Sequence, residues 1–262
     1  MICFTTLIYA LGKAVGPQQA ANYFNQWVQQ GRGEAPLDCL ATLRAVQRVY
    51  SAEPIGVLVD AGGAHIGKAR SRLFTLAFEQ MKDDDDVWLT VDDDVRVPPG
   101  TVKVLIDAAR GPGPRIVTVP YALRGQAASS SSLVGSNGQA LTQADPTSID
   151  VTWRKPVDGE VVPENLHPIH SAGFGCVAMN RQAMEVMAAQ SILFYEIERQ
   201  WWGPFADYYG DYGGPDGRNY VQWYGEDRSF FARVPKNVSC YSLIVGESSH
   251  AGLTLDLGKV QR

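Results

Sequence analysis

The sequence has few cysteines, no excess of positive charge and no long hydrophobic run, and each absence argues against a class of protein. Its 262 residues include 4 cysteines, which are widely separated and lack both metal-ligand spacing and the density of a disulfide-rich scaffold. We therefore expect free thiols in a reducing compartment. The net charge of −5 argues against a broad surface for binding polyanions.

The apolar run over residues 2–11 is too short to cross a membrane, and no charged segment precedes it. No polybasic segment or long cationic amphipathic helix indicates attachment to a membrane surface. We expect a cytoplasmic protein without a membrane span, in which this run forms the first strand of a sheet.

Short apolar runs alternate with segments of helical periodicity through the first half of the chain. Strands are expected at residues 2–11, 55–59, 87–91 and 116–119, and helices at residues 18–30, at 37–50, through Ile66 and Ala77, and through Val102 and Ala109. This alternation predicts an α/β fold with a mostly parallel sheet flanked by helices.

The second half is richer in aromatic residues and less regular. A polar segment without periodicity, residues 124–150, is expected to be a mobile loop. The elements expected after it are a small hairpin of residues 151–153 and 161–162, a helix over 181–189, a glycine-rich aromatic loop over 195–224, and a closing strand over 238–245 that precedes His250. His167 and His170 are expected to be loop residues. Aromatic side chains on such a loop are typical of platforms that stack on sugars or bases.

Three adjacent carboxylates, Asp92, Asp93 and Asp94, follow the apolar strand over residues 87–91. In α/β sheets, ligands bind beyond the carboxyl ends of the strands. Side-chain alternation predicts that Asp92 and Asp94 point one way and Asp93 the other. Neighbouring carboxylates repel one another unless a cation lies between them, and a hard divalent cation with oxygen ligands fits that place. The acidic residues 83–86, before the strand, instead fit a solvated turn.

A pair of glycines at residues 62–63 precedes a helix whose first turns carry Lys68, Arg70 and Arg72. Helix N-termini favour anions, so cations there indicate a bound anion such as a phosphate. The alternative is a solvated helix face on which Arg70 pairs with the acidic residues 83–86. No phosphate-loop lysine motif accompanies the glycines.

Four motifs, in this order, resemble those of GT-A glycosyltransferases. Ala69-Arg70-Ser71-Arg72 resembles the Ala-Arg-Asn helix start, Thr90-Val91-Asp92-Asp93-Asp94-Val95 with Pro98 resembles the Asp-x-Asp strand end, Gly173-Phe174-Gly175-Cys176 resembles the glycine turn before the acceptor region, and Gly225-Glu226-Asp227 followed by His250 resembles the Glu-Asp motif and the C-terminal metal histidine. The match covers about residues 55 to 252. Ser71 departs from it, because the family often has asparagine there.

The resemblance implies a GT-A-like (Rossmann-like) fold in a single domain over residues 1–262. Its nucleotide-sugar-binding half would cover about residues 1–123, and an aromatic-rich acceptor lobe about residues 151–262. The implied reaction is the metal-dependent transfer of a hexosyl or pentosyl group from a UDP-linked sugar to an acceptor hydroxyl, with Mn²⁺ or Mg²⁺. The acceptor is open between a glycan, a protein, a lipid-linked sugar and a modified nucleic-acid base.

The same resemblance assigns roles to individual residues. Asp94 and His250 would ligate the metal, and Asp92 would contact either the ribose or the metal through its water. The implied donor-binding residues are Arg70, Ser71, Asp92 and Asp93. A bound metal would stabilise the negative charge that builds up on the leaving nucleoside diphosphate.

Asp227, at the start of a helix, is the implied general base for the acceptor hydroxyl, and Glu226 is the alternative base or orients the acceptor. The structural alternatives are that both carboxylates only complement a helix dipole, and that His250 only caps a strand. Two other functions use the same residues. A nucleotidyltransferase would attack a phosphate instead, and a faint glycine-rich loop at residues 12–16 is its best support. A non-catalytic sugar- or nucleotide-binding module would bind without turnover.

Overall fold

The computed structural model describes residues 1–8, 17–30, 37–61, 65–121, 151–196, 199–206, 208–213, 219–250 and 253–256. The loop expected over residues 124–150, the glycines at 62–63 and the glycine-rich stretch at 12–16 lie outside the described residues. Within the described part of the chain, no helix is long and apolar enough to cross a membrane.

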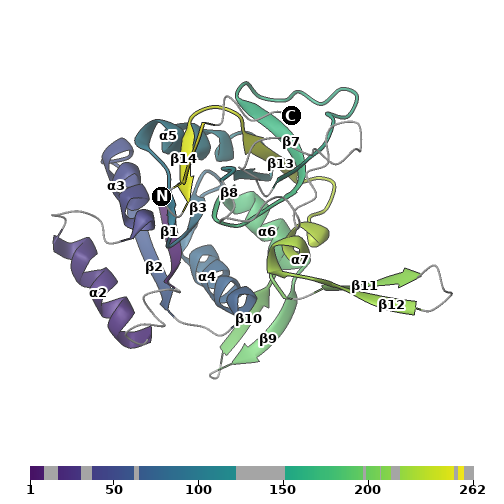
Figure 1. The fold of residues 1–262 in the computed structure, drawn as a ribbon, viewed down its shortest axis with the longest axis horizontal. Helices are drawn as coiled ribbons and strands as arrows, with labels where there is room; N and C mark the ends of the chain where they lie inside the picture. Colours follow the sequence, from purple (N-terminus) through teal and green to yellow (C-terminus); the bar gives the residue numbers. More distant parts are fainter. Residues whose placement is uncertain are drawn as a thin grey trace.

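An eight-stranded sheet lies at the centre of the molecule, in the order β2-β1-β3-β8-β5-β13-β7-β6 (Figure 1). Its strands are β1 (Ile2–Ile8), β2 (Ile55–Ala61), β3 (Val87–Asp92), β5 (Arg115–Thr118), β6 (Val151–Trp153), β7 (Leu166–Ala172), β8 (Cys176–Asn180) and β13 (Ser239–Leu243). Strands β7 and β8 run antiparallel to their neighbours, so the other six point the same way. The predicted mostly parallel sheet is confirmed.

Helices cover both faces of this sheet. On one face α3 (Asp38–Val49) packs against α5 (Pro99–Ala109), and on the other α4 (Ile66–Gln80) contacts α6 (Arg181–Ala189) and α7 (Glu226–Arg233). Helix α2 (Pro17–Gln30) lies beside β2 at the edge of the sheet (Figure 1). This coverage explains why the first five residues of β3 are all buried, since strands between two helix layers need apolar side chains on both faces.

Strand β7 was not expected, and the predicted hairpin is wrong. β6 pairs with β7 instead of with residues 161–162, and β7 contains His167 and His170. Pro168 hides this strand in the sequence, because proline normally interrupts a central strand. The structure accommodates it beside an irregularity in β6, between Thr152 and Trp153.

The aromatic segment over residues 195–224 also differs from the predicted loop, because it forms two hairpins. One pairs β9 (Ile192–Glu196) with β10 (Arg199–Gly203), and the other pairs β11 (Tyr208–Gly213) with β12 (Asn219–Tyr224). The backbone register of the second hairpin places residue 212 opposite residue 220. This second hairpin extends away from the body of the molecule (Figure 1).

An aromatic cluster joins α7 to the sheet. The rings of Phe174, Phe205 and Phe230 have centroids 4.6 to 4.8 Å apart, and Phe231 packs beside them. Phe174 precedes β8, Phe205 follows β10, and Phe230 lies in α7. The aromatic-rich second half of the chain therefore contributes a packed core around the start of α7.

We predict that the native protein is unreactive toward a thiol reagent such as DTNB at mildly alkaline pH. All four cysteines are free and buried, and burial raises the pKa of Cys3, Cys39 and Cys240 to about 12 and raises that of Cys176 as well. Thiolate, the reactive form, is therefore scarce. All four thiols should react once guanidinium chloride unfolds the chain, and rapid modification of any thiol in the native protein would contradict the expected burial.

Candidate active site

The carboxyl ends of β1, β2 and β3 meet at one edge of the sheet. Leu7 of β1 pairs with Asp60 of β2 on one side and with Asp92 of β3 on the other. The two carboxylate-bearing residues therefore lie at the same level, with one strand between them. This is the edge at which sheets of this kind bind ligands.

Strand β3 ends at Asp92, and Asp93 and Asp94 form a turn that leads into β4 (Val95–Arg96). The backbone N–H of Asp92 donates a hydrogen bond of 2.8 Å to the carbonyl of Gly175, so the glycine turn before β8 closes over the strand end. Strand alternation applies to Asp92 but not to the two residues of the turn. Asp93 is buried, whereas Asp92 and Asp94 are half-buried.

Arg70 is the centre of this edge. It lies in α4, is 4% exposed, and forms ion pairs with carboxylates from two other elements. Its Nη2 lies 3.0 Å from each carboxylate oxygen of Asp92, and its Nη1 lies 3.2 Å from Oε1 of Glu226. Nη1 also donates to Asp227, the second residue of α7. The guanidinium lies over the ring of Phe174, 5.6 Å from its centroid.

In this cluster three carboxylates share the Arg70 guanidinium. Burial would lower the pKa of Arg70, but the carboxylates of Asp227, Asp92 and Glu226 outweigh burial and raise it, so the guanidinium stays charged. One cation faces three carboxylates, each about a quarter exposed, and Asp94 follows close by in the chain. Several carboxylates thus gather at a solvent-accessible edge, an arrangement typical of cation-binding sites. Nε of Arg70 is also buried without a hydrogen-bond partner among the described residues.

Gly67 permits the close approach of α4 and α7. A Cβ atom at this position would lie 2.6 Å from the carbonyl oxygen of Phe205 and 3.1 Å from Cβ of Glu226. With glycine there, Arg70, one turn further along α4, reaches the first residues of α7. The Ser71 hydroxyl donates to the Gly67 carbonyl at 2.7 Å and the residue is 1% exposed. This placement gives Ser71 a role inside the helix and does not support its expected contact with a donor.

His250 is the last residue of β14 (Glu247–His250), which pairs with β4 and with β15 (Leu253–Asp256). The register places His250 opposite Val95, the residue after Asp94. Gly246 adopts a φ of 97°, and the N–H of Glu247 donates to Oγ1 of Thr101 at 2.9 Å, which fixes the start of the strand. The backbone of His250 thus lies beside Val95, the residue that follows the Asp92–Asp94 turn.

A second ion-paired cluster, which sequence reasoning missed, lies next to the first. Arg72 donates to Oδ2 of Asp60 from Nη2 at 2.6 Å and from Nε at 2.9 Å, and it also reaches Glu196 of β9. Lys68 lies 2.6 Å from the same glutamate. Asp60 is the last residue but one of β2 and follows an apolar run as Asp92 does in β3, so the sequence carried a signal for this carboxylate. The proposed pairing of Arg70 with the acidic residues 83–86 is wrong, since its partners are Asp92, Glu226 and Asp227.

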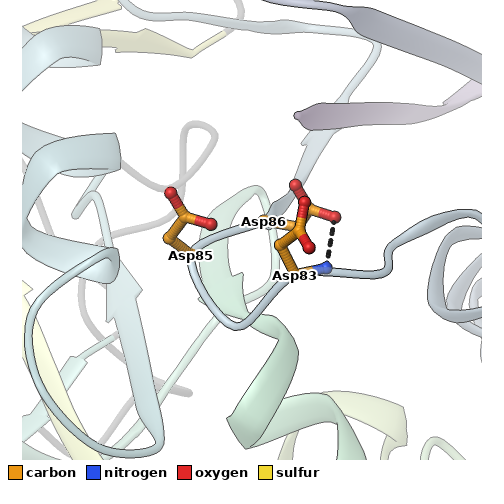
Figure 2. A group of neighbouring side chains, drawn as sticks. All are labelled: Asp83, Asp85 and Asp86. Atoms are coloured by element: carbon orange, nitrogen blue, oxygen red, sulfur yellow. Dashed lines mark hydrogen bonds between the residues drawn. The ribbon is translucent and has the colours of Figure 1, made fainter.

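The described residues contain one group of three carboxylates whose oxygens lie within 4.8 Å of one another: Asp83, Asp85 and Asp86 (Figure 2). It precedes β3, about 20 Å from Asp92 at the rise of a strand. Asp86 accepts hydrogen bonds from the N–H groups of Lys82 and Asp83 and pairs with the amino group of Met1. Internal partners therefore account for its burial, while Asp83 and Asp85 are exposed, as expected of a solvated turn.

No protein-family model and no curated protein sequence matches the chain. Protein A197 from STIV aligns over 99% of this chain and 91% of that chain, with 16% identity and a TM-score of 0.47. GalNAc-T7 with UDP, GalNAc and Mn²⁺ aligns over 95% of this chain and 43% of that chain, with 7% identity and a TM-score of 0.45. S. aureus TarS 1–349 in complex with UDP-GlcNAc aligns over 100% of this chain and 61% of that chain, with 12% identity and a TM-score of 0.33. The chain spans less than two thirds of the last two proteins, and these similarities are too low to assign it to a family.

We predict that Arg70→Met lowers the free energy of unfolding by about 3 kcal/mol, because it leaves three carboxylates without their shared cation. Arg72→Met is the matched control, since that side chain is 22% exposed and its loss should cost about 1 kcal/mol or less. Urea denaturation of both variants measures the difference. Equal losses in the two variants would contradict the central role of Arg70.

Proposed function

We propose that the chain is a metal-dependent glycosyltransferase that moves a sugar from a nucleoside diphosphate to an acceptor hydroxyl. The observation that supports this most directly is the cluster of Arg70 with Asp92, Glu226 and Asp227 at the carboxyl edge of the sheet. Donor-side and acceptor-side motifs that lie far apart in the sequence are in direct contact there. The halves proposed for a single domain, residues 1–123 and 151–262, each supply part of the cluster.

The residues present fit a divalent cation. Asp92, Asp94 and His250 offer two carboxylates and an imidazole, a set that suits Mn²⁺, and carboxylates alone suit Mg²⁺. The gathering of carboxylates around Arg70 supports a cation at this edge. When bound, the metal would neutralise charge on the diphosphate of the donor. The proposed donor is a nucleotide-sugar, with a UDP-linked sugar as the first to test.

The sequence suggested that Arg70 contacts the donor, but in this proposal it has a different role. Its guanidinium is occupied by carboxylates, so we assign it to holding Asp92 and Asp227 in fixed relative positions. Asp92 and Asp93 stay the proposed donor contacts at the strand end. Asp60 of β2 adds a carboxylate at the same level of the edge as Asp92, with β1 between the two strands.

Asp227 is the proposed general base. During transfer the acceptor oxygen replaces the nucleoside diphosphate at the anomeric carbon, and the hydroxyl proton passes to the carboxylate of Asp227. Glu226, beside it and also bound to Arg70, would orient the acceptor. Gly225 alone separates Glu226 from the end of β12. This short connection supports a role for the β11–β12 hairpin in binding the acceptor.

We expect a nucleoside diphosphate and Mn²⁺ together to raise the melting temperature more than either does alone. Binding to the native state at roughly 100 times the dissociation constant stabilises by about 2.7 kcal/mol, or roughly 5 to 10 °C for a chain of this size. Differential scanning fluorimetry with UDP and other nucleoside diphosphates measures this shift.

The acidic turn after β3 (residues 92–94) and the acidic turn before it (residues 83–86) provide matched variants for this experiment. Asp94→Ala should abolish the joint shift, whereas Asp83→Ala, in the acidic turn at the far end of β3, should leave it intact. A joint shift that survives Asp94→Ala, or its absence with every nucleotide and metal combination, would contradict the proposed donor site.

Asp227→Asn should retain donor binding but lower the rate of donor turnover by roughly 10²-fold or more, because it removes the proton acceptor and keeps the shape of the side chain. Hydrolysis or transfer from the nucleotide-sugar that gives the joint shift measures the rate. A non-catalytic binding module would instead show no turnover in the unaltered protein, and equal turnover in both proteins would exclude Asp227 as the base.

A further inference from the structure

The β9–β10 hairpin is a rigid attachment to α4. The N–H of Trp202 in β10 donates to Oγ1 of Thr75 at 3.1 Å, and its ring meets that of Phe78 edge-on with centroids 5.2 Å apart. In β9, Glu196 is held by Lys68 and Arg72. Contacts from both strands therefore fix the hairpin on the helix, so its outer edge is preformed.

That outer edge is apolar and unpaired. Strand β9 pairs with β10 on one side, and no other strand of the described residues pairs with it. Ile192 is 53% exposed, Leu193 59% and Tyr195 70%, so three large apolar side chains in one five-residue strand face solvent. Edge strands in soluble proteins are usually protected by lysine, proline or a bulge. β9 contains neither residue, and its register with β10 is continuous.

The backbone pattern specifies what kind of partner fits this edge. Glu196 and Arg199 form the last pair of the ladder, and two residues separate them. The pair that flanks a two-residue turn is hydrogen-bonded, and hydrogen-bonded pairs alternate with non-hydrogen-bonded pairs along an antiparallel ladder. The backbone groups of Ile192, Phe194 and Glu196 then face β10, and those of Leu193 and Tyr195 face outward. An extended strand satisfies such groups, whereas a helix or a lipid surface does not.

We propose that the chain associates with a second copy of itself by antiparallel pairing of β9 with β9, about a two-fold axis at Phe194. This register sets Leu193 opposite Tyr195 of the partner subunit, and the reciprocal pair follows from the symmetry. Leu193 and Tyr195, whose backbone groups face outward, exchange backbone hydrogen bonds with the partner, and the exposed side chain of each meets that of the other. Aliphatic–aromatic cross-strand pairs of this kind stabilise sheets.

The charges of the strand do not oppose pairing with a second copy. Glu196 is the charged residue of β9, and in this register it lies opposite Ile192 of the partner subunit, so the two glutamates do not face each other. Lys68 and Arg72 already neutralise it. The contact is small compared with the roughly 800 Å² per partner of a stable interface. The dimer should therefore be weak, with a dissociation constant in the micromolar range or above.

Sedimentation velocity over a concentration series tests the association. The unaltered chain should shift from monomer to dimer as its concentration rises, and Tyr195→Lys should abolish the shift without changing the melting temperature. Val161→Lys is the control, because Val161 is apolar, 88% exposed and outside this hairpin. A monomer at every concentration, or a dimer that persists in Tyr195→Lys, would overturn the proposal.

Disulfide trapping tests the register. Phe194 lies on the proposed axis, where facing Cα atoms of a pair without hydrogen bonds are about 4.5 Å apart, within reach of a disulfide. Phe194→Cys should cross-link under mild oxidation. Leu193→Cys, although more exposed, should not, since its two copies would be separated by more than about 7 Å. The four native cysteines are buried and do not interfere. Equal cross-linking of both variants, or cross-linking of Leu193→Cys alone, would overturn this register.

Discussion

The buried guanidinium of Arg70 is the interaction on which the arrangement of the active-site edge depends. It connects three elements, because α4 supplies the cation while β3 and α7 supply the carboxylates. An arginine is suited to this place, since its planar fork offers several donors and keeps its charge when buried. Each carboxylate would repel the others without it. The geometry of the strand end and of the start of α7 is therefore set by a single side chain.

The packing beneath this cluster explains why Arg70 can reach its partners. Gly67 removes the side chain that would separate α4 from Phe205 and Glu226. Phe205 and Phe230 stack on each other and meet Phe174 edge-on, and the ring of Phe174 also lies under the guanidinium. Phe205, in the segment that the sequence predicted to be a glycine-rich aromatic loop, thus contributes to the rigid support of the charged cluster.

The sequence predicted those parts of the fold that depend on local patterns. The apolar runs and helical periodicities located β1, β2, β3 and the helices between them, and the abrupt change from apolar residues to carboxylates marked Asp92 as a strand end. Strands that depend on distant partners were missed or misread. β7 contains a proline and pairs with β6 and β13, and β14 pairs with β4. The partners of Arg70 could not be predicted from local patterns either, because its contact with Asp227 joins residues 157 positions apart.

Because the ladder between β14 and β4 is short, the candidate site can open without unfolding of the whole chain. Only two residue pairs, Ser249 with Arg96 and His250 with Val95, are recorded between these strands, while the large sheet has longer ladders throughout its centre. Local opening has a low free-energy cost where few bonds must break. The last residues of β14, which carry His250, can therefore separate from β4 while the start of the strand stays bound to Thr101 and Pro120 and the eight-stranded sheet stays folded. A chain that is fully native by spectroscopy can still contain molecules in which this edge is open.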